Sequence, residues 1–394
     1  MRFWLVRLGS VAAVSGIALA IDLLARGDLA RDLTTRAGLY VILAVSLNLI
    51  NGITGQFSIG HAAFYMIGAY SAGVIAANYY SKMGLPAPLW LLLVMCSGAF
   101  FAAIAGFIVG LPSLKLRGDY LAIVTMGFGE IIVIIALNQK ALGQAYGMNI
   151  EPKLNYIWIV WLLAFLVIAV SRNLLKNAHG LAFLGVREDE IASAAMGVNV
   201  TRTKVTAFVL GSAFAGAAGA LYAHFEAFIG PNTFRMDLSF IILTMVVLGG
   251  TGSVTGSTLA AITLFYIPEK MRDVRDVRMA MIVSAAIAVI VGVALIKRAA
   301  DHYHGPRLKK NLMILGFAAG SFGLALVLAP LIANVPGLAG KVDGAKLRFV
   351  ILAATLVILM LLRPQGVFAH HEFSWSWVKK VFGKRRVPQT AVSS

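Results

Sequence analysis

The sequence predicts an all-α, polytopic transmembrane protein with about 10–11 membrane segments, some of them broken or re-entrant. Hydrophobic residues make up 59% of the 394 residues, and charged residues only 13%. A water-soluble chain of this length could not bury that much apolar surface, so lipid must cover much of it. The apolar residues also gather into runs of about 20 residues, the length of a helix that crosses a bilayer.

The charge and cysteine content exclude several classes of protein. The net charge is +17, but Lys and Arg fall between and beyond the apolar runs and form no basic, aromatic-rich domain, so nucleic-acid binding is rejected. The single cysteine, Cys96, lies inside an apolar run and rules out a disulfide framework. The seven histidines form no HExxH motif and no CxxC is present, so we expect no metal site.

The first apolar run, residues 3–24, is long enough to be a retained membrane span, although Arg2, Arg7 and the apolar residues up to Ala20 resemble a signal peptide. The later runs are 37–53, 58–79, 88–110, 119–138, 155–172, 203–225, 238–267, 279–296, 311–333 and 346–362. Basic residues cluster near Pro112, in a polar island at 178–204 and in the tail after Leu362. The positive-inside rule places these segments, and by parity the N-terminus, in the cytoplasm.

The polar island contains a predicted short helix, residues 187–196. Three acidic residues would occupy its first turn, where they suit the helix dipole, and a glycine follows its last residue, a common end for a helix. Small and apolar side chains would share one face. The residues of this segment are Arg187, Glu188, Asp189, Glu190, Ile191, Ala192, Ala195, Met196 and Gly197. So short a helix is marginal alone and must lie against the membrane surface or a partner.

The run 238–267 is too long for one span and is interrupted by glycines and small polar residues at 249–257. The island and the tail are both cytoplasmic, so the number of crossings between them must be even. A re-entrant hairpin that enters from outside and returns there restores this parity. This topology places the basic segment 267–278 outside, which the positive-inside rule disfavours.

A second break occurs early, at residues 47–70, where Gly52, Gly55 and Gly60 interrupt an apolar stretch. Two glycine-interrupted segments, one in each half, indicate an internal repeat around a central pathway. Polar side chains inside a span are costly, so those near the breaks either bond to one another at helix contacts or line that pathway. The candidate pathway residues are Asn48, Thr54, Gln56, Ser58, His61, Glu130, Gly250, Gly252 and Ser253.

Two of these candidates raise separate questions. Glu130 lies midway along the run 119–138, where it either receives a substrate's ammonium group or bonds across a helix interface. Ser253 lies in a helix break, as a protease nucleophile would, but no GxSxG motif or suitably placed histidine accompanies it. We therefore expect no catalytic residue.

Several long segments resemble one known family. The stretch REDEIASAAMGVNVTRTKVTAFVLGSAFAGAAGALYA, from Arg187, is similar to the coupling-helix loop and following helix of ABC-importer permeases for branched-chain amino acids. The segments LNLINGITGQFSIGHAAFYMIGAY, LRGDYLAIVTMGFGEII, MVVLGGTGSVTG and LLRPQGVF resemble the same family in the same order. Within the family, the match is to the M-type permease subunit, and it extends from about residue 37 to residue 368.

The resemblance implies how the protein works and with which partners. The island would dock on an ATPase in the cytoplasm and transmit ATP-driven closure to the membrane helices. The partners would be a second related permease, two ABC ATPases and an external solute-binding protein, in the bacterial cytoplasmic (inner) membrane. The chain has no GxxxxGK motif followed by Ser or Thr, so ATP would bind to the partners and this chain would need no cofactor.

The resemblance also implies the substrate and the division of the chain. Branched-chain or other neutral amino acids are expected, with urea or short amides as the alternative; an ion-coupled secondary transporter is the alternative from another class. We expect one transmembrane domain over 1–394. It comprises a first span and loop (1–36), a core (37–275) with the coupling helix (187–196), a two-helix insertion (276–344) of unknown role, a last core span (345–368) and a cytoplasmic tail (369–394).

Overall fold

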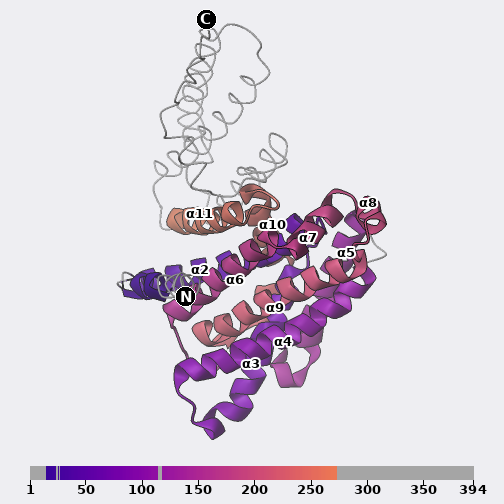
Figure 1. The fold of residues 1–394 in the computed structure, drawn as a ribbon. Coiled ribbons are helices and arrows are strands. Elements are labelled where there is room, and N and C mark those ends of the chain that lie inside the picture. The colour runs from indigo at the N-terminus through magenta and orange to yellow at the C-terminus, as the bar shows by residue number, and fades with distance from the viewer. Residues whose placement is uncertain (1–14, 24, 26, 114–117, 273–394) are drawn as a thin grey trace, which may run out of the picture.

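The computed structural model describes residues 15–272 except 24, 26 and 114–117, and Figure 1 shows their arrangement. The predicted insertion, last core span and tail lie outside the described residues, as does the start of the first span, of which residues 15–23 are helical. The α-helices are α2 (Asp28–Asn48), α3 (His61–Met83), α4 (Ala87–Ser113), α5 (Asp119–Asn138), α6 (Ile157–Lys176), α7 (Ala178–Glu188), α8 (Glu190–Ala195), α9 (Val200–Glu226), α10 (Met236–Gly249) and α11 (Val254–Arg272).

Shorter elements connect these helices. They are the π-helix η1 (Leu49–Ile53), the 3-10 helices η2 (Lys140–Leu142), η3 (Gln144–Tyr146) and η4 (Pro231–Phe234), and the strands β1 (Met148–Asn149) and β2 (Phe228–Ile229). The two strands pair antiparallel, Met148 opposite Ile229. The described chain is thus almost wholly helical, as the sequence predicts.

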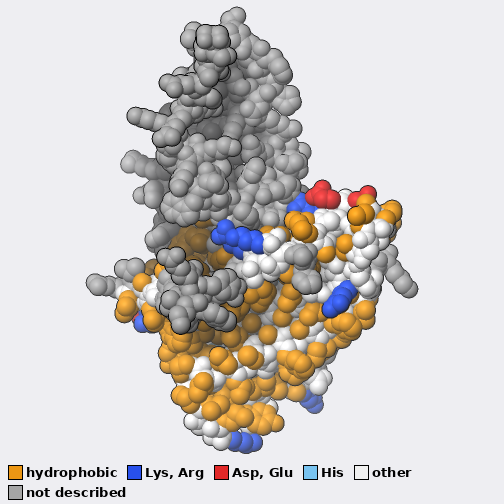
Figure 2. Space-filling model, in the orientation of Figure 1, with side chains coloured by type: hydrophobic (Ala, Val, Ile, Leu, Met, Phe, Trp, Pro, Cys, Tyr) orange, Lys and Arg blue, Asp and Glu red, His pale blue; other side chains and the backbone are white. Residues whose placement is uncertain are grey.

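Six helical segments in the described residues are long and apolar enough to cross a membrane, so the protein is an all-α, polytopic membrane protein. They are Asp28–Ile53, Ala87–Pro112, Tyr120–Asn138, Ile157–Lys176, Val200–Glu226 and Pro231–Gly249. Helix α3 has 23 residues, which is long enough for a span, but its glycine, serine and tyrosine content makes it less apolar. Apolar side chains cover most of the face seen in Figure 2.

Most predicted runs match a helix, and the differences lie at their ends. Helix α5 coincides with the run 119–138. Helix α2 begins at Asp28, well before residue 37, because its first turns are polar and held by ion pairs that an apolar-run criterion misses. Arg36 Nε lies 2.9 Å from Asp32 Oδ2, at the i,i+4 spacing that joins neighbours on a helix.

Helix α9 is the centre of the core, and it packs closely against α3 and α4 through residues without large side chains. A Cβ atom at Gly216 would lie 2.3 Å from the carbonyl oxygen of Gly98, and one at Gly68 would lie 2.0 Å from the carbonyl oxygen of Gly216. Such small-residue contacts let membrane helices approach until their backbones touch. The three helices run side by side in Figure 1.

Different elements lie at the two ends of the helix bundle. One end, which we call the island end, carries α7 and α8. At the opposite end, β1 pairs with β2, and Arg36 Nη2 lies 2.5 Å from Oε1 of Glu226, the last residue of α9. These contacts join segments that are far apart in the sequence.

The interruption predicted within 238–267 is confirmed as a turn between two helices, α10 and α11. Its glycines, Gly250 and Gly252, have φ of 111° and 95°, values that favour glycine. The turn lies at the island end beside Gly52, and α11 then returns along α2, where the Phe265 and Tyr40 rings lie 5.4 Å apart. The first arm is longer than predicted, because η4 extends α10 to spanning length.

The single helix predicted at 187–196 is wrong. Arg187 and Glu188 end helix α7, and a six-residue helix, α8, begins at Glu190. Asp189 separates the two in an extended conformation, and its Oδ1 accepts hydrogen bonds from the backbone N–H groups of Ile191 and Ala192. Aspartate at this position caps the next helix, so the chain turns there and does not continue a helical first turn.

The end predicted for this helix is confirmed. Gly197 has φ of 84°, its N–H donates to the Ala194 carbonyl at 3.0 Å, and the N–H of Val198 donates to the Ser193 carbonyl at 3.0 Å. This pair of bonds is the Schellman arrangement, which satisfies the last carbonyls of a helix.

Candidate functional site

The two glycine breaks meet at the island end of the bundle. Asn48 Oδ1 accepts a hydrogen bond from the backbone N–H of Gly252 at 2.8 Å, across 204 residues of sequence. A Cβ atom at Gly52 would lie 2.2 Å from that same nitrogen, so the two backbones are in direct contact. The pathway candidates Asn48 and Gly252 are therefore neighbours, and the breaks form one junction, which we call the glycine junction.

Arg187, at the end of α7, lies on the glycine junction. A Cβ atom at Gly55 would lie 3.2 Å from Arg187 Cγ, and one at Gly252 would lie 2.4 Å from Arg187 Nη1. The side chain is 17% exposed, so most of this long cation is packed into the junction. One residue of the polar island thus contacts both helix breaks, and the absence of side chains at Gly55 and Gly252 makes the space it occupies.

A second connection runs from α8 to the early break. Glu190 Oε1 forms an ion pair with Nζ of Lys204, which is buried on α9. The Lys204 carbonyl in turn accepts a hydrogen bond from Gln56 Nε2 at 3.3 Å. Breaking a buried ion pair by removing one partner is strongly destabilising, because the remaining charge is left uncompensated. The first turn of α8 is therefore firmly held to the segment that follows η1.

Most of α8 is open to its surroundings, although Ser193 is buried against α7. Ile191 is 72% exposed and Met196 is 84% exposed, and Ala192, Ala195 and Gly197 are exposed beside them. Glu188 and Asp189 are exposed at the start of this surface. Acidic side chains gather at this end of the molecule in Figure 2. Exposed apolar residues rimmed by charges are typical of a surface that binds another protein.

The polar candidates of the early break lie together and are buried. Asn48, Ser58 and His61 are 0% exposed, Thr54 2% and Gln56 4%. Part of the cluster bonds internally, since Gln56 Nε2 donates to Thr54 Oγ1 at 2.9 Å and His61 Nε2 lies 2.8 Å from Ser46 Oγ.

Other atoms of this cluster lack partners. Asn48 Nδ2, Gln56 Oε1, Ser58 Oγ and His61 Nδ1 are buried without a hydrogen bond to any described residue. Buried polar groups are nearly always paired, and each unpaired one costs about 1–3 kcal/mol. Four such atoms in one small region make the cluster a candidate site for water or substrate.

The remaining pathway candidates occupy different places. Ser253 is buried and caps α11, since its Oγ accepts from the backbone N–H of Gly256 at 3.0 Å. Gly250 supplies the turn that precedes it. Glu130 is half-buried on α5 and lines a small space with Gly60, the last glycine of the early break, and Ser239. The structure thus brings Asn48 and Gly252 into direct contact, and it places Glu130 beside Gly60, at the far end of the early break.

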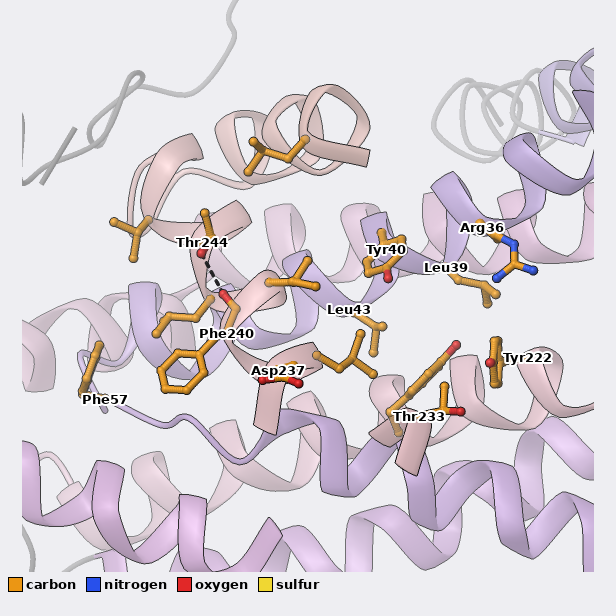
Figure 3. Close-up of a pocket in the computed structure, with 16 residues that line it drawn as sticks. Arg36, Leu39, Tyr40, Leu43, Phe57, Tyr222, Thr233, Asp237, Phe240 and Thr244 are labelled. Carbon is orange, nitrogen blue, oxygen red and sulfur yellow. Dashed lines mark hydrogen bonds between the residues drawn. The ribbon is translucent and has the colours of Figure 1, made fainter. Parts of the chain in front are cut away.

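Sequence reasoning missed a cavity of about 800 Å³, which Figure 3 shows between α2, α9 and α10. None of the nine pathway candidates lines it. Among the residues that the structure describes, the charged ones in its lining are Arg36 and Asp237. Arg36 lies in the polar start of α2 and Asp237 in the first turn of α10, where a carboxylate also suits the helix dipole. No local pattern distinguishes these residues from ordinary helix-end charges.

Comparison with known proteins gives a consistent picture. The family model described as "branched-chain amino acid transport system / permease component" matches residues 29–292. The LivM permease protein of the high-affinity branched-chain amino acid transport system is 34% identical over 296 residues, in both Salmonella typhimurium and Escherichia coli. The match covers 66% of this chain and 68% of each relative.

A second permease of that system is more distantly similar. The LivH permease protein of Salmonella typhimurium is 25% identical over 253 residues, which is 58% of this chain and 80% of LivH. No solved structure matches the chain significantly.

Proposed function

The chain belongs to the family of permease components of branched-chain amino acid transport systems, and from this we propose that it is the M-type permease subunit of an ABC importer. The importer takes up leucine, isoleucine or valine through the bacterial inner membrane. The permease carries no ATPase or catalytic site of its own and needs no cofactor, because its partners bind ATP. Urea or short amides are the alternative substrates, and the cognate binding protein's ligand decides between them.

The observation that carries this proposal is the contact between Arg187 and both glycine breaks. An importer driven by an external motor needs a rigid connection from its cytoplasmic surface to the helices that move. The end of α7 supplies one through Arg187, and the start of α8 supplies another through Glu190 and Lys204. A displacement of the island would therefore shift the ends of α2, α10 and α11 together.

We propose that the exposed surface of α8 docks on the ATPase. Ile191, Ala192, Ala195 and Met196 offer a small apolar surface to a groove, and Gly197 lets the chain turn away beyond them. Glu188 and Asp189 rim this surface, while Arg187 and Glu190 point back into the permease. The division of the island into two helices favours this role, since α7 is anchored at the glycine junction and α8 is exposed to a partner.

The polar cluster at the early break is the proposed translocation path. Asn48, Thr54, Gln56, Ser58 and His61 form the cluster, and Gly250, Gly252 and Ser253 would complete the path from the other break, where Gly252 donates to Asn48 Oδ1. The unpaired atoms of the cluster would find partners in a passing amino acid when the junction opens. Glu130 lines a small space with Gly60 at the end of the same break and is kept as a further candidate of this path.

The proposed partners are a second related permease, two ABC ATPases and an external solute-binding protein. The similarity of this chain to both LivM and LivH supports a pair of related permeases. A pair of this kind would cover part of the apolar surface that α4 and α5 expose, such as Phe100 at 62% and Ile123 at 61%. Lipid covers the remainder.

Uptake in membrane vesicles tests this function against an ion-coupled secondary transporter. We expect leucine uptake to require internal ATP, the partner ATPases and the binding protein. Uptake that a proton or sodium gradient drives in this chain alone would show that it is a secondary transporter and would falsify the proposal. The ligand that copurifies with the binding protein identifies the substrate in the same preparation.

A further inference from the structure

The cavity shown in Figure 3 has a size and lining suited to a small ligand. Its volume of about 800 Å³ lies within the range of about 300–1,000 Å³ that is typical of small-molecule sites. One wall is a stripe of α2 at the helical spacing i, i+3, i+4 and i+7, from Arg36 to Leu43. The facing wall is α10, and α9 contributes Tyr222 at the end near Arg36.

Of the two charged residues of the cavity, Arg36 forms ion pairs within the described part of the chain and Asp237 does not. Arg36 forms ion pairs with Asp32 and Glu226, and its guanidinium also lies 5.4 Å from the centre of the Phe225 ring. Asp237 is exposed to the cavity and has no hydrogen bond or ion pair with any described residue. The charge that the cavity offers to a ligand is therefore a carboxylate.

The uncharged lining of the cavity favours a ligand that has both an aliphatic and an anionic group. Leu43, Leu238, Ile241 and Val247 bring branched aliphatic side chains to the same cavity as Asp237. Burial of apolar surface stabilises a complex by about 25 cal/mol per Å², so a branched aliphatic ligand gains most here. Tyr222 and Thr233 place hydroxyl groups toward the Arg36 end, where they can donate to an anion directly or through water. The ring centre of Tyr65, which also lines the cavity, lies 5.3 Å from that of Tyr222.

We propose that this cavity is a binding site for an aliphatic α-amino acid, and that Asp237 receives its ammonium group. The side chain packs against the leucine, isoleucine and valine wall, and the carboxylate points toward the hydroxyl groups at the Arg36 end. The inference rests on the proposed function and adds to it a site that is distinct from the polar cluster at the glycine junction.

The position of the cavity connects this site to transport. Its two long walls are α2 and α10, and these are the helices that end at the glycine junction beside Arg187. A movement of the junction would change the separation of the walls and hence the affinity for the ligand. Coupling of this kind requires only that the two arrangements of the helices bind the amino acid unequally.

Protection of an introduced cysteine tests binding directly in the assembled complex. Thr244 lines the cavity two helical turns from Asp237, so Thr244→Cys in a Cys96→Ala background gives a single thiol beside the site. We expect leucine and 3-methylbutylamine, which has the ammonium group alone, to slow its alkylation by N-ethylmaleimide roughly tenfold. 4-Methylpentanoate, which lacks the ammonium group, should not protect, and Asp237→Asn should abolish protection by the first two.

Several results would overturn the assignment. They are an absence of protection by leucine, equal protection by 4-methylpentanoate, and protection that persists in Asp237→Asn. Protection by phospholipid alone would likewise show that the cavity is a lipid site. Asp28→Asn is the matched control, because Asp28 also lies in the first turn of a helix but does not line the cavity.

Transport measurements separate this inference from the proposed function. We expect Asp237→Asn to lower ATP-dependent leucine uptake roughly tenfold and Asp28→Asn to leave it unchanged. A wild-type complex that takes up no branched-chain amino acid contradicts the proposed function itself. A wild-type complex that transports leucine, with Asp237→Asn equally active, contradicts only the assignment of the cavity.

Discussion

Gly52 and Gly252 are in backbone contact, and neither position has room for a side chain. A Cβ atom at Gly52 would lie 1.9 Å from Asn48 Oδ1, and one at Gly252 would fall on Arg187 Nη1 at 2.4 Å. Glycine is thus a steric requirement at Gly52, whereas at Gly252 the positive φ is the stronger constraint, because Arg187 Nη1 is the end of a flexible side chain. The smallest substitution tests how tightly the junction is packed.

We expect Gly52→Ala to destabilise the protein by about 2 kcal/mol or more, because the backbone of Gly252 cannot move aside cheaply and the Asn48 side chain would lose its place in the junction. Thermal unfolding in detergent measures this as a lower midpoint. Gly127→Ala is the matched control, because Gly127 lies within α5 with open space around it and alanine favours helix. Equal midpoints for both variants would show that the junction is loosely packed.

Arg187 is the residue through which we expect the island to act on the junction. Arg187→Ala should lower ATP-dependent leucine uptake about tenfold while the ATPase remains bound, since the docking surface on α8 is unchanged. Arg187→Lys should be intermediate, because it keeps the charge but loses the planar fork.

Arg202→Ala is the control for this experiment, because Arg202 is an exposed arginine of the same island. Uptake and ATPase copurification are measured on the same preparations. Full transport by Arg187→Ala would show that the motion reaches the helices by another route, with the Glu190–Lys204 ion pair as the next candidate.

Among the elements, α7 and α8 are separated by one residue, Asp189, and the two helices have different surroundings. Asp189 caps α8, so α7 ends against the junction and α8 projects from it. A continuous helix would have turned the exposed residues of α8 to other directions, because each residue adds a rotation of about 100°. The Schellman end at Gly197 then returns the chain to α9, where Asn199 caps the next helix.

A bulky charged residue at Ala192 or Ala195 should release the ATPase. Ala192→Glu and Ala195→Glu place a charge in the middle of the exposed apolar surface of α8, and we expect ATPase copurification to fall about tenfold or more. The membrane part should stay folded, because both positions are exposed.

The matched control is Ala141→Glu, an exposed alanine in η2 at the opposite end of the bundle. Unfolding midpoints in detergent confirm that all three variants remain intact. Full transport and unchanged copurification in both α8 variants would exclude this surface as the docking site.

At the scale of the whole molecule, the two ends of the helix bundle carry different features. The island, both helix breaks and the hairpin turn lie at one end, while β1, β2 and the Arg36–Glu226 ion pair lie at the other. The proposed docking surface on α8 and the β1–β2 pair therefore lie at opposite ends of the described bundle, and we expect the first to face the cytoplasm and the second the outside.

Labelling from the two sides of the membrane tests this orientation. In a Cys96→Ala background, Met196→Cys should react with an impermeant maleimide only from the cytoplasmic side, and Tyr146→Cys only from outside. Both positions are well exposed, at 84% and 89%, so access is set by the membrane and not by burial. Added ATPase should protect Met196→Cys alone. Labelling of both from the same side would contradict the topology.

Much of the fold could be predicted from local sequence, because runs of apolar residues indicate membrane helices and glycines indicate the breaks between them. Helix α5, the turn at 249–257 and the left-handed Gly197 were predictable for this reason. The division at Asp189 was not, because an aspartate within three adjacent acids can occupy a helical turn or cap the next helix with equal ease. The start of α2 was missed because charged residues that form ion pairs along the helix interrupt its apolar pattern.

Contacts between distant segments decided the rest. No pattern within residues 47–70 or 249–257 indicates that Gly52 meets Gly252, or that Arg187 lies on both. Asp237 stands in the first turn of a helix like many other acids, and only the packing of α2 against α10 encloses it in a cavity. The physical reason is range: periodicity and capping act within a few residues, whereas a junction or a cavity exists only once separate helices have packed.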